Sequence, residues 1–144
     1  EELVVVSSAV QPPVAGVEGI DIEQLARLPL VFLADSYDLR ATTDAAFRAA
    51  GLAPTPVVEG AEMDAALRFV ERGLGVAVVP AMVLLDRPTL RSARLREPRL
   101  VRTLGIAHRS DVNPTRAAAT MRRVIVQTAR ELVERDPSTM RLVE

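Results

Sequence analysis

The sequence predicts an α/β fold in which buried parallel strands alternate with amphipathic helices. The clearest evidence is the segment 57–80, which reads VVEGAEMDAALRFVERGLGVAVVP. Apolar residues recur at helical spacing along residues 62–72, and Gly73 then supplies the left-handed residue that commonly ends a helix. The unbroken apolar run that follows, Gly75–Val79, is typical of a strand buried on both faces. A strand, a helix and a second strand in this order predict a right-handed βαβ unit.

The elements before this segment show the same alternation. Leu3–Val6 is a short apolar run and predicts a strand. Asp21 and Gln24 have the spacing of a capping box, which predicts a helix that ends before Pro29. Leu30–Leu33 is apolar and bounded on both sides, so we expect it to be a buried strand.

A second helix and a further strand come next. We expect Asp35 or Ser36 to cap the helix, whose apolar face continues to Ala50 before Gly51 ends it. Thr55–Glu59 is then the strand that leads into the segment 57–80. The three strands of this region are expected to be parallel, in the order second, first, third within one sheet.

The chain after this unit is expected to contain a short helix, a weak strand at Leu90–Leu95 and a last strand at Val101–Ala107. Asn113 is followed by proline, which predicts the start of a long helix that extends to about Glu134. Residues 137–144 are expected to form a frayed tail.

Composition limits the class of protein. The 144 residues suffice for one ordinary domain, and with 49% hydrophobic residues and a net charge of −1 the chain is expected to fold. The absence of cysteine excludes disulfides and thiolate chemistry. No apolar run approaches the roughly 20 residues that a membrane span needs, so we expect a cytoplasmic protein with no membrane partner. The near-neutral charge argues against nucleic-acid binding by this segment itself.

The sequence contains no recognisable catalytic set. His108 is the only histidine, and no spacing of histidine and carboxylates indicates a metal, so neither a metal nor a cofactor is expected. Gly73 and Gly75 lie after a helix and before a strand, the reverse of a dinucleotide-binding motif. A basic patch is a weak alternative, since arginines on loops are usually solvated. Its members would be Arg87, Arg91, Arg94, Arg96, Arg99 and Arg102.

Two loops predict a ligand site instead. Each follows the carboxyl end of a strand and precedes a helix, the place where open α/β sheets bind ligands at helix N-termini. The plainer alternative is that Asp35 and Ser36 only cap a helix and that Glu59 is a polar strand end. The residues of the two loops are Ala34, Asp35, Ser36, Tyr37, Glu59, Gly60 and Ala61.

Three motifs in this order resemble a known family. AFRAAGLAP, a glutamate after the next strand and RGLGVAVVP are similar to the effector-binding domain of LysR-type transcriptional regulators. The resemblance runs from about Glu2 to Val133. It implies a type II periplasmic-binding-protein-like fold of two lobes joined by two crossing segments. It also implies that DNA is bound only through a helix-turn-helix domain that this chain lacks.

The resemblance implies a division of the chain. Residues 13–104 would form a complete second lobe, and residues 1–12 and 105–136 would be remnants of the first lobe and of the crossings. The crossings would fall near Ala9–Pro13 and Arg102–Gly105. Leu3–Val6 and Val101–Ala107 are then expected to leave the middle lobe, with the long last helix packed outside its sheet.

The resemblance also implies a function. The domain would sense a small-molecule effector in the cleft between the lobes, with residues 34–37 as one wall and with Leu104 and Ile106 as the floor. Asp35 and Glu59 would disfavour an acidic effector unless helix dipoles or an arginine offset their charge.

Self-association is the other partner that we expect. Its predicted surface is the edge strand Thr55–Glu59 together with the helix Glu62–Arg72. Two alternatives for the function stay open, because the two-lobed fold does not decide it. The chain would then be a lobe of a solute-binding protein or a lobe of an enzyme.

Overall fold

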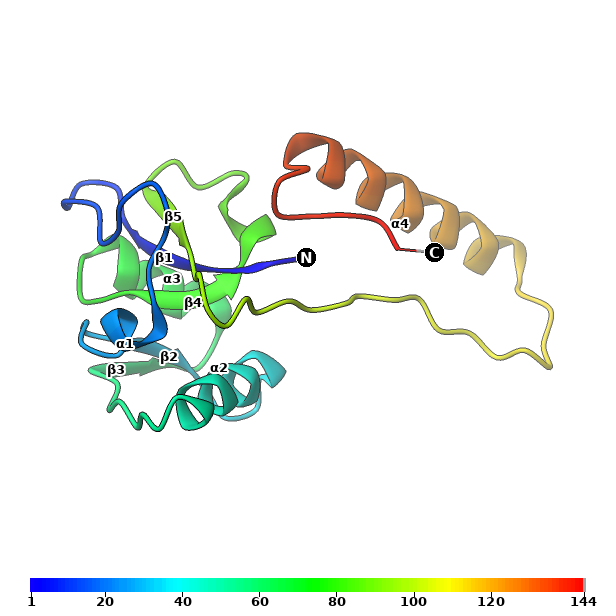
Figure 1. Cartoon of the computed structure of the whole chain (residues 1–144). Coiled ribbons are helices and arrows are strands. Elements are labelled where there is room, and N and C mark those ends of the chain that lie inside the picture. Colours follow the sequence, from blue (N-terminus) through cyan, green and yellow to red (C-terminus); the bar gives the residue numbers. More distant parts are fainter. Residues whose placement is uncertain (144) are drawn as a thin grey trace.

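A computed structural model describes residues 1–143 of the chain. It shows a lobe built around a β-sheet, from which an extended arm runs out and returns as one long helix (Figure 1). The elements in chain order are β1 (Leu3–Ser8), α1 (Ile22–Leu25), β2 (Val31–Leu33), α2 (Asp38–Ala49), β3 (Val58–Gly60), α3 (Met63–Glu71), β4 (Ala77–Pro80), the 3-10 helix η1 (Ala81–Leu84), β5 (Leu90–Arg94) and α4 (Arg116–Arg135).

The strands form a mixed sheet. β2 and β3 pair in parallel, whereas β1 pairs with β4 on one side and β5 on the other, both antiparallel. A parallel bridge between Leu30 and Val76 joins the two groups, and the N–H of Val31 donates to the carbonyl of Val76 at 2.8 Å. The predicted order β3-β2-β4 is confirmed, and these three strands are parallel to one another as predicted. The antiparallel pairing of strand β1, which extends the sheet beyond β4, was not predicted.

β1 lies at the centre of the lobe rather than outside it. All six of its residues are buried, and it has a paired strand on each side. The predictions that Leu3–Val6 leaves the middle lobe and that Ala9–Pro13 is a crossing are therefore wrong. The N–H of Ala9 bonds to the carbonyl of Thr89 at 2.8 Å, which keeps this segment in the lobe. An unbroken apolar run needs cover on both faces, and here only an interior strand has it.

The helices bury the apolar faces that their periodicity predicts. α3 lies behind the sheet in Figure 1 and contacts β1, β2, β3 and β4. Ala66, Leu67 and Val70 form its buried face. α2 packs on the sheet through Phe47, which is 2% exposed and stacks on Phe32 of β2 with ring centroids 6.2 Å apart.

The predicted capping box of Asp21 and Gln24 is present at the start of α1, and the predicted glycine stops are confirmed, but the predicted cap of α2 is wrong. Gly51 and Gly73 have φ of 71° and 76° directly after α2 and α3, as predicted. The N-cap of α2 is Tyr37, so neither Asp35 nor Ser36 caps it. Because α2 starts after Tyr37, the side chains of Asp35 and Ser36 are exposed at the surface.

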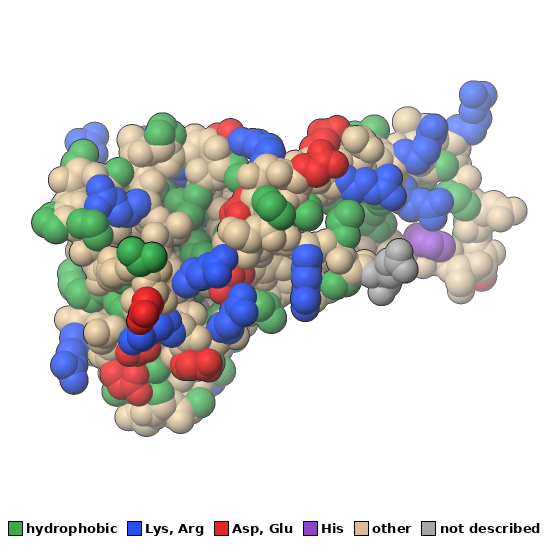
Figure 2. Space-filling view, turned by 45° about the horizontal axis from the view of Figure 1, so that its top comes forward, with side chains coloured by type: hydrophobic (Ala, Val, Ile, Leu, Met, Phe, Trp, Pro, Cys, Tyr) green, Lys and Arg blue, Asp and Glu red, His purple; other side chains and the backbone are tan. Residues whose placement is uncertain are grey.

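Residues 101–115 form an arm that leaves the lobe. Val101 makes a single bridge to Glu2, and the predicted strand Val101–Ala107 is not formed, because no neighbouring strand pairs with it in the part of the chain described. α4 then has no buried residue and lies outside the sheet, as predicted. Figure 2 shows basic side chains along this part of the molecule. None of the helices in residues 1–143 combines the length and apolarity needed to cross a membrane.

The segment after α4 returns to the lobe. The N–H of Glu2 donates to the carbonyl of Thr139 at 2.8 Å, and Arg94 donates to the carbonyl of Ser138 at 2.9 Å. Met140 is 6% exposed. The prediction of a frayed tail is therefore wrong for residues 138–140, while residue 144 lies outside the described residues.

Candidate functional site

The two predicted loops meet at the carboxyl edge of β2 and β3. The N–H of Ala34 donates to the carbonyl of Gly60 at 3.1 Å. The hydroxyl of Tyr37 donates to Oε2 of Glu62 at 2.7 Å and accepts from the N–H of Met63 at 3.3 Å. These bonds hold the start of α2 beside the start of α3.

Neither helix is capped by its own N-cap residue, although the hydroxyl of Tyr37 accepts the first N–H of α3, that of Met63. The N-caps of α2 and α3 are Tyr37 and Glu62, and neither accepts a bond from its own first turn. First-turn N–H groups without a cap are donors for a ligand oxygen. Gly60 is required here, because a Cβ at this position would lie 2.8 Å from the backbone nitrogen of Ala66.

Arg40 links the two loops. Its Nη1 donates to the carbonyl of Leu33 at 2.9 Å and to Oε1 of Glu59 at 3.0 Å, and it lies 3.4 Å from Oδ1 of Asp35. Its Nε donates to Oδ2 of Asp44 at 3.0 Å. One guanidinium therefore holds three carboxylates, two of which belong to the predicted loops.

The position of Arg40 depends on packing as well as on charge. Its guanidinium carbon lies 4.5 Å from the ring centroid of Phe32, within the range of a cation–π contact. Burial acts to lower the pKa of Arg40, but hydrogen bonds to Glu59 and Asp44 outweigh it, so the pKa is raised above its ordinary value. Arg40 is therefore a permanent cation at the site.

Tyr37 is held as a hydrogen-bond donor. Its pKa is raised above the ordinary value, first by the hydrogen bond to Glu62 and then by burial. The phenol is therefore protonated at neutral pH. It keeps the two helix starts together without adding charge.

A groove of about 560 Å³ lies beside the loops, between α3 and residues 82–89. Met63 and Asp64 line its near end. Arg87 crosses the groove, with Nη2 at 2.5 Å from Asp64 and Nη1 at 3.5 Å from Glu71. The charged groups of this groove therefore pair with one another across it.

Comparison with known proteins identifies the domain. The profile described as the LysR substrate binding domain matches residues 1–130, which is most of the chain. The chain belongs to this family.

Relatives and solved structures agree with this identification. An HTH-type transcriptional regulator of Bacillus subtilis, YybE, is 34% identical over 95 residues, which make up 66% of this chain and 32% of the relative. The effector binding domain of BenM, solved with its effector benzoate, is 25% identical with a TM-score of 0.58, covering 68% of this chain and 46% of that one. The chain thus spans about a third of the length of the curated relative, which has 32% of its residues matched.

A third comparison shows the fold alone. The effector binding domain of QuiR, solved in complex with shikimate, is 20% identical with a TM-score of 0.64. The match covers 90% of this chain and 62% of that chain. The fold of that domain therefore extends over most of this chain.

Within this LysR domain, the structure brings together some of the predicted site residues. Residues 34–37 and 59–61 meet, whereas Leu104 and Ile106 lie on the arm with 64% and 46% exposure and do not pack as a floor. Arg40 was not predicted. Its signal was available, because it precedes Asp44 by four residues on a helix that starts directly after the first loop.

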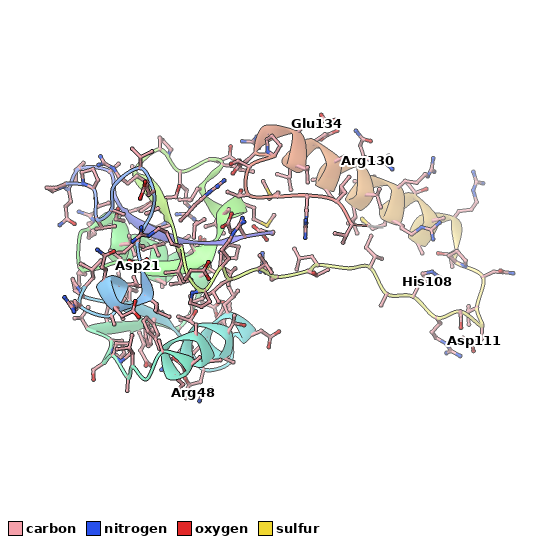
Figure 3. The ribbon with its side chains drawn as sticks, viewed as in Figure 1. Asp21, Arg48, His108, Asp111, Arg130 and Glu134 are labelled. Carbon is pink, nitrogen blue, oxygen red and sulfur yellow. The ribbon has the colours of Figure 1, made fainter. Side chains whose placement is uncertain are left out.

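His108 and Asp111, the remaining candidates for catalysis or metal binding in the LysR domain, do not lie at the two loops. His108 and Asp111 lie on the arm, far from Arg48 on α2 (Figure 3). Within residues 1–143 the His108 ring has one hydrogen-bond contact, Nδ1 at 3.1 Å from the carbonyl of Arg109. The same residues contain no group suited to a metal ion.

The arginines of the alternative basic patch are mostly bonded within the lobe. All six arginines have an acidic side chain or a backbone carbonyl as partner: Arg87, Arg91, Arg94, Arg96, Arg99 and Arg102. These partners favour the interpretation that the six arginines are solvated or paired over the interpretation that they form a nucleic-acid-binding surface.

Proposed function

We propose that the chain is the ligand-sensing part of a LysR-type transcriptional regulator and that residues 34–37 and 59–61 form one wall of its effector site. The observation that carries the proposal is the pair of helix N-termini held side by side by the bond between Tyr37 and Glu62, neither of which is capped by its own N-cap side chain. Ligands of open α/β sheets bind at this edge. Two structures of the same fold were solved with small molecules, shikimate and benzoate.

The rest of the proposal concerns the whole regulator. We include Leu104 and Ile106 in the proposed effector site, because their apolar side chains on the arm are exposed and could contact a second wall of the cleft. DNA would be bound by another part of the protein, as the helix-turn-helix in the relative's description suggests. The regulator would act in the cytoplasm, where both DNA and small metabolites are present.

Titration of the ¹⁵N-labelled chain with small metabolites tests the site. We expect a binding metabolite to shift the amide signals of residues 34–37 and 59–64. Ala61→Trp should abolish these shifts, because Ala61 is exposed beside both helix starts. Ala53→Trp is the matched control, since Ala53 is an exposed alanine in the loop that precedes β3.

The proposed site is contradicted if the shifts caused by a bound metabolite lie elsewhere. It is also contradicted if Ala61→Trp leaves the binding unchanged. The same spectra show whether each variant is folded, so loss of binding and loss of structure are distinguished.

We propose further that copies of the chain associate through the predicted surface, Thr55–Glu59 with the outer face of Glu62–Arg72. β3 pairs only with β2 in the described residues and therefore has an open edge. Open edges present unpaired backbone groups that a partner covers. α3 reaches across the sheet from β3 to β1, so only its outer face, which includes the exposed Arg68, is available to the partner.

Sedimentation of the chain over a range of concentrations measures this association. Arg68→Glu is expected to weaken it, whereas Arg122→Glu, the same change on the exposed face of α4, should leave it intact. A stable interface buries about 800 Å² on each partner. A chain that stays monomeric at high concentration contradicts the proposal, and loss of association in Arg122→Glu alone would assign the surface to α4.

A further inference from the structure

Acidic side chains outnumber basic ones at the two helix starts. The two loops, the N-caps and the first turn of α2 carry four carboxylates, and the second turn of α2 adds a fifth. The four are Asp35, Asp38, Glu59 and Glu62, and the fifth is Asp44. Arg40 is the only basic side chain in the described part of the chain that forms an ion pair with any of them. Five carboxylates against one guanidinium leave the site strongly negative.

The cation at the site is already shared. Arg40 gives Nη1 to Glu59 and Asp35 and gives Nε to Asp44. Its charge is therefore spread over three carboxylates before any ligand arrives. The two helix N-termini add only about half an elementary charge each, which does not reverse the sign.

The exposed acidic groups are open to a ligand. The side chain of Asp35 is 88% exposed and that of Glu59 is 50% exposed, although both lie beside Arg40. An ionised carboxylate only accepts hydrogen bonds and offers about four acceptor positions. The ion pairs with one guanidinium nitrogen leave most of these positions free.

From this geometry we infer that the effector presents N–H or O–H donors and carries no carboxylate, as a cationic amine or a neutral polyol does. The inference rests on the proposed function, because it concerns the same two loops. A ligand of this class can donate to Asp35 and Glu59, whereas an anion meets like charge there. Shikimate and benzoate, the small molecules in the two structures of this fold, both carry a carboxylate. This chain is therefore expected to differ from those domains in its effector class.

Three probes with one phenyl ring and different charge test the inference by chemical-shift titration. Benzylamine is a cation at neutral pH, benzyl alcohol is a neutral donor and benzoate is an anion. We expect saturable shifts in residues 34–37 and 59–61, with a dissociation constant for benzylamine or benzyl alcohol at least tenfold below that for benzoate. A tenfold ratio corresponds to about 1.4 kcal/mol. The order of the first two probes distinguishes a cationic from a neutral effector.

A double variant isolates the charge. Asp35→Asn with Glu59→Gln keeps the size of both side chains and removes two negative charges, so the preference against benzoate should fall several-fold. Asp111→Asn with Glu131→Gln makes the same chemical changes on the arm and on α4, and should leave the preference as it is in the wild type. The spectra of both double variants report whether the lobe is folded.

The possible results distinguish failure of the inferred effector class from failure of the proposed site. Benzoate binding at these loops as tightly as the other probes would overturn the inference and leave the proposed site standing. Probe shifts confined to other surfaces, or no saturable shift with any probe, would overturn the site and the inference with it. An unchanged preference in the Asp35 and Glu59 double variant would also overturn the inference, because the preference would then have another cause.

Discussion

Replacing Phe47 with alanine is expected to lower the free energy of unfolding by about 3–5 kcal/mol, the range for large-to-small changes of buried phenylalanine. Phe47 is 2% exposed and supports Phe32, on which the guanidinium of Arg40 rests. The cavity that Phe47→Ala creates would therefore lie directly beneath the candidate site. Urea unfolding followed by circular dichroism measures the stability of the variant.

Phe69→Ala is the matched control for this prediction. Phe69 also lies on a helix, α3, but it is only partly buried at the margin of the core. A smaller loss of stability is therefore expected, because less apolar surface leaves the protein interior. Equal losses in the two variants would contradict the assignment of Phe47 to the centre of the α2 packing.

Gly75→Ala is expected to lower the free energy of unfolding by about 1–3 kcal/mol, the usual range for overpacking. A Cβ at Gly75 would lie 2.4 Å from the carbonyl oxygen of Pro29 and 2.9 Å from its carbonyl carbon. The same carbonyl accepts the N–H of Val76 at 2.8 Å, where β2 joins β4. The backbone must move to admit the methyl group, so the connection between the two parts of the sheet weakens.

Gly16→Ala makes the same change where it should be harmless. No heavy atom lies within 4 Å of a Cβ built at Gly16. The only effect of the new methyl group would then be to reduce the conformational entropy of the unfolded chain. The free energy of unfolding of Gly16→Ala should therefore equal that of the wild type or exceed it by up to about 1 kcal/mol. Thermal and urea unfolding of both variants measure the difference, and a Gly75→Ala variant as stable as Gly16→Ala would contradict the close approach of β2 and β4.

Local patterns were sufficient to predict most of the lobe. The apolar face of α3 and the glycine stops after α2 and α3 each depend on residues close in sequence. The two loops of the candidate site were found in the same way, because each lies between a strand and a helix. The assignment of Leu104 and Ile106 came from a resemblance, and the structure does not bring them to the loops.

The sequence by itself determined the alternation of strands and helices, the family of the domain and the two loops at the strand ends, because periodicity and turn residues act over a few positions. Only the tertiary structure decided that β1 occupies the centre of the sheet, since antiparallel pairing joins residues about 70 to 90 positions apart, as Val5 with Val78 and Val5 with Ala93 show. It also decided that Arg40 gathers Asp35, Asp44 and Glu59. Such an ion-pair cluster depends on how α2 packs against β2 and β3, and helical spacing alone could indicate no more than the pair of Arg40 with Asp44.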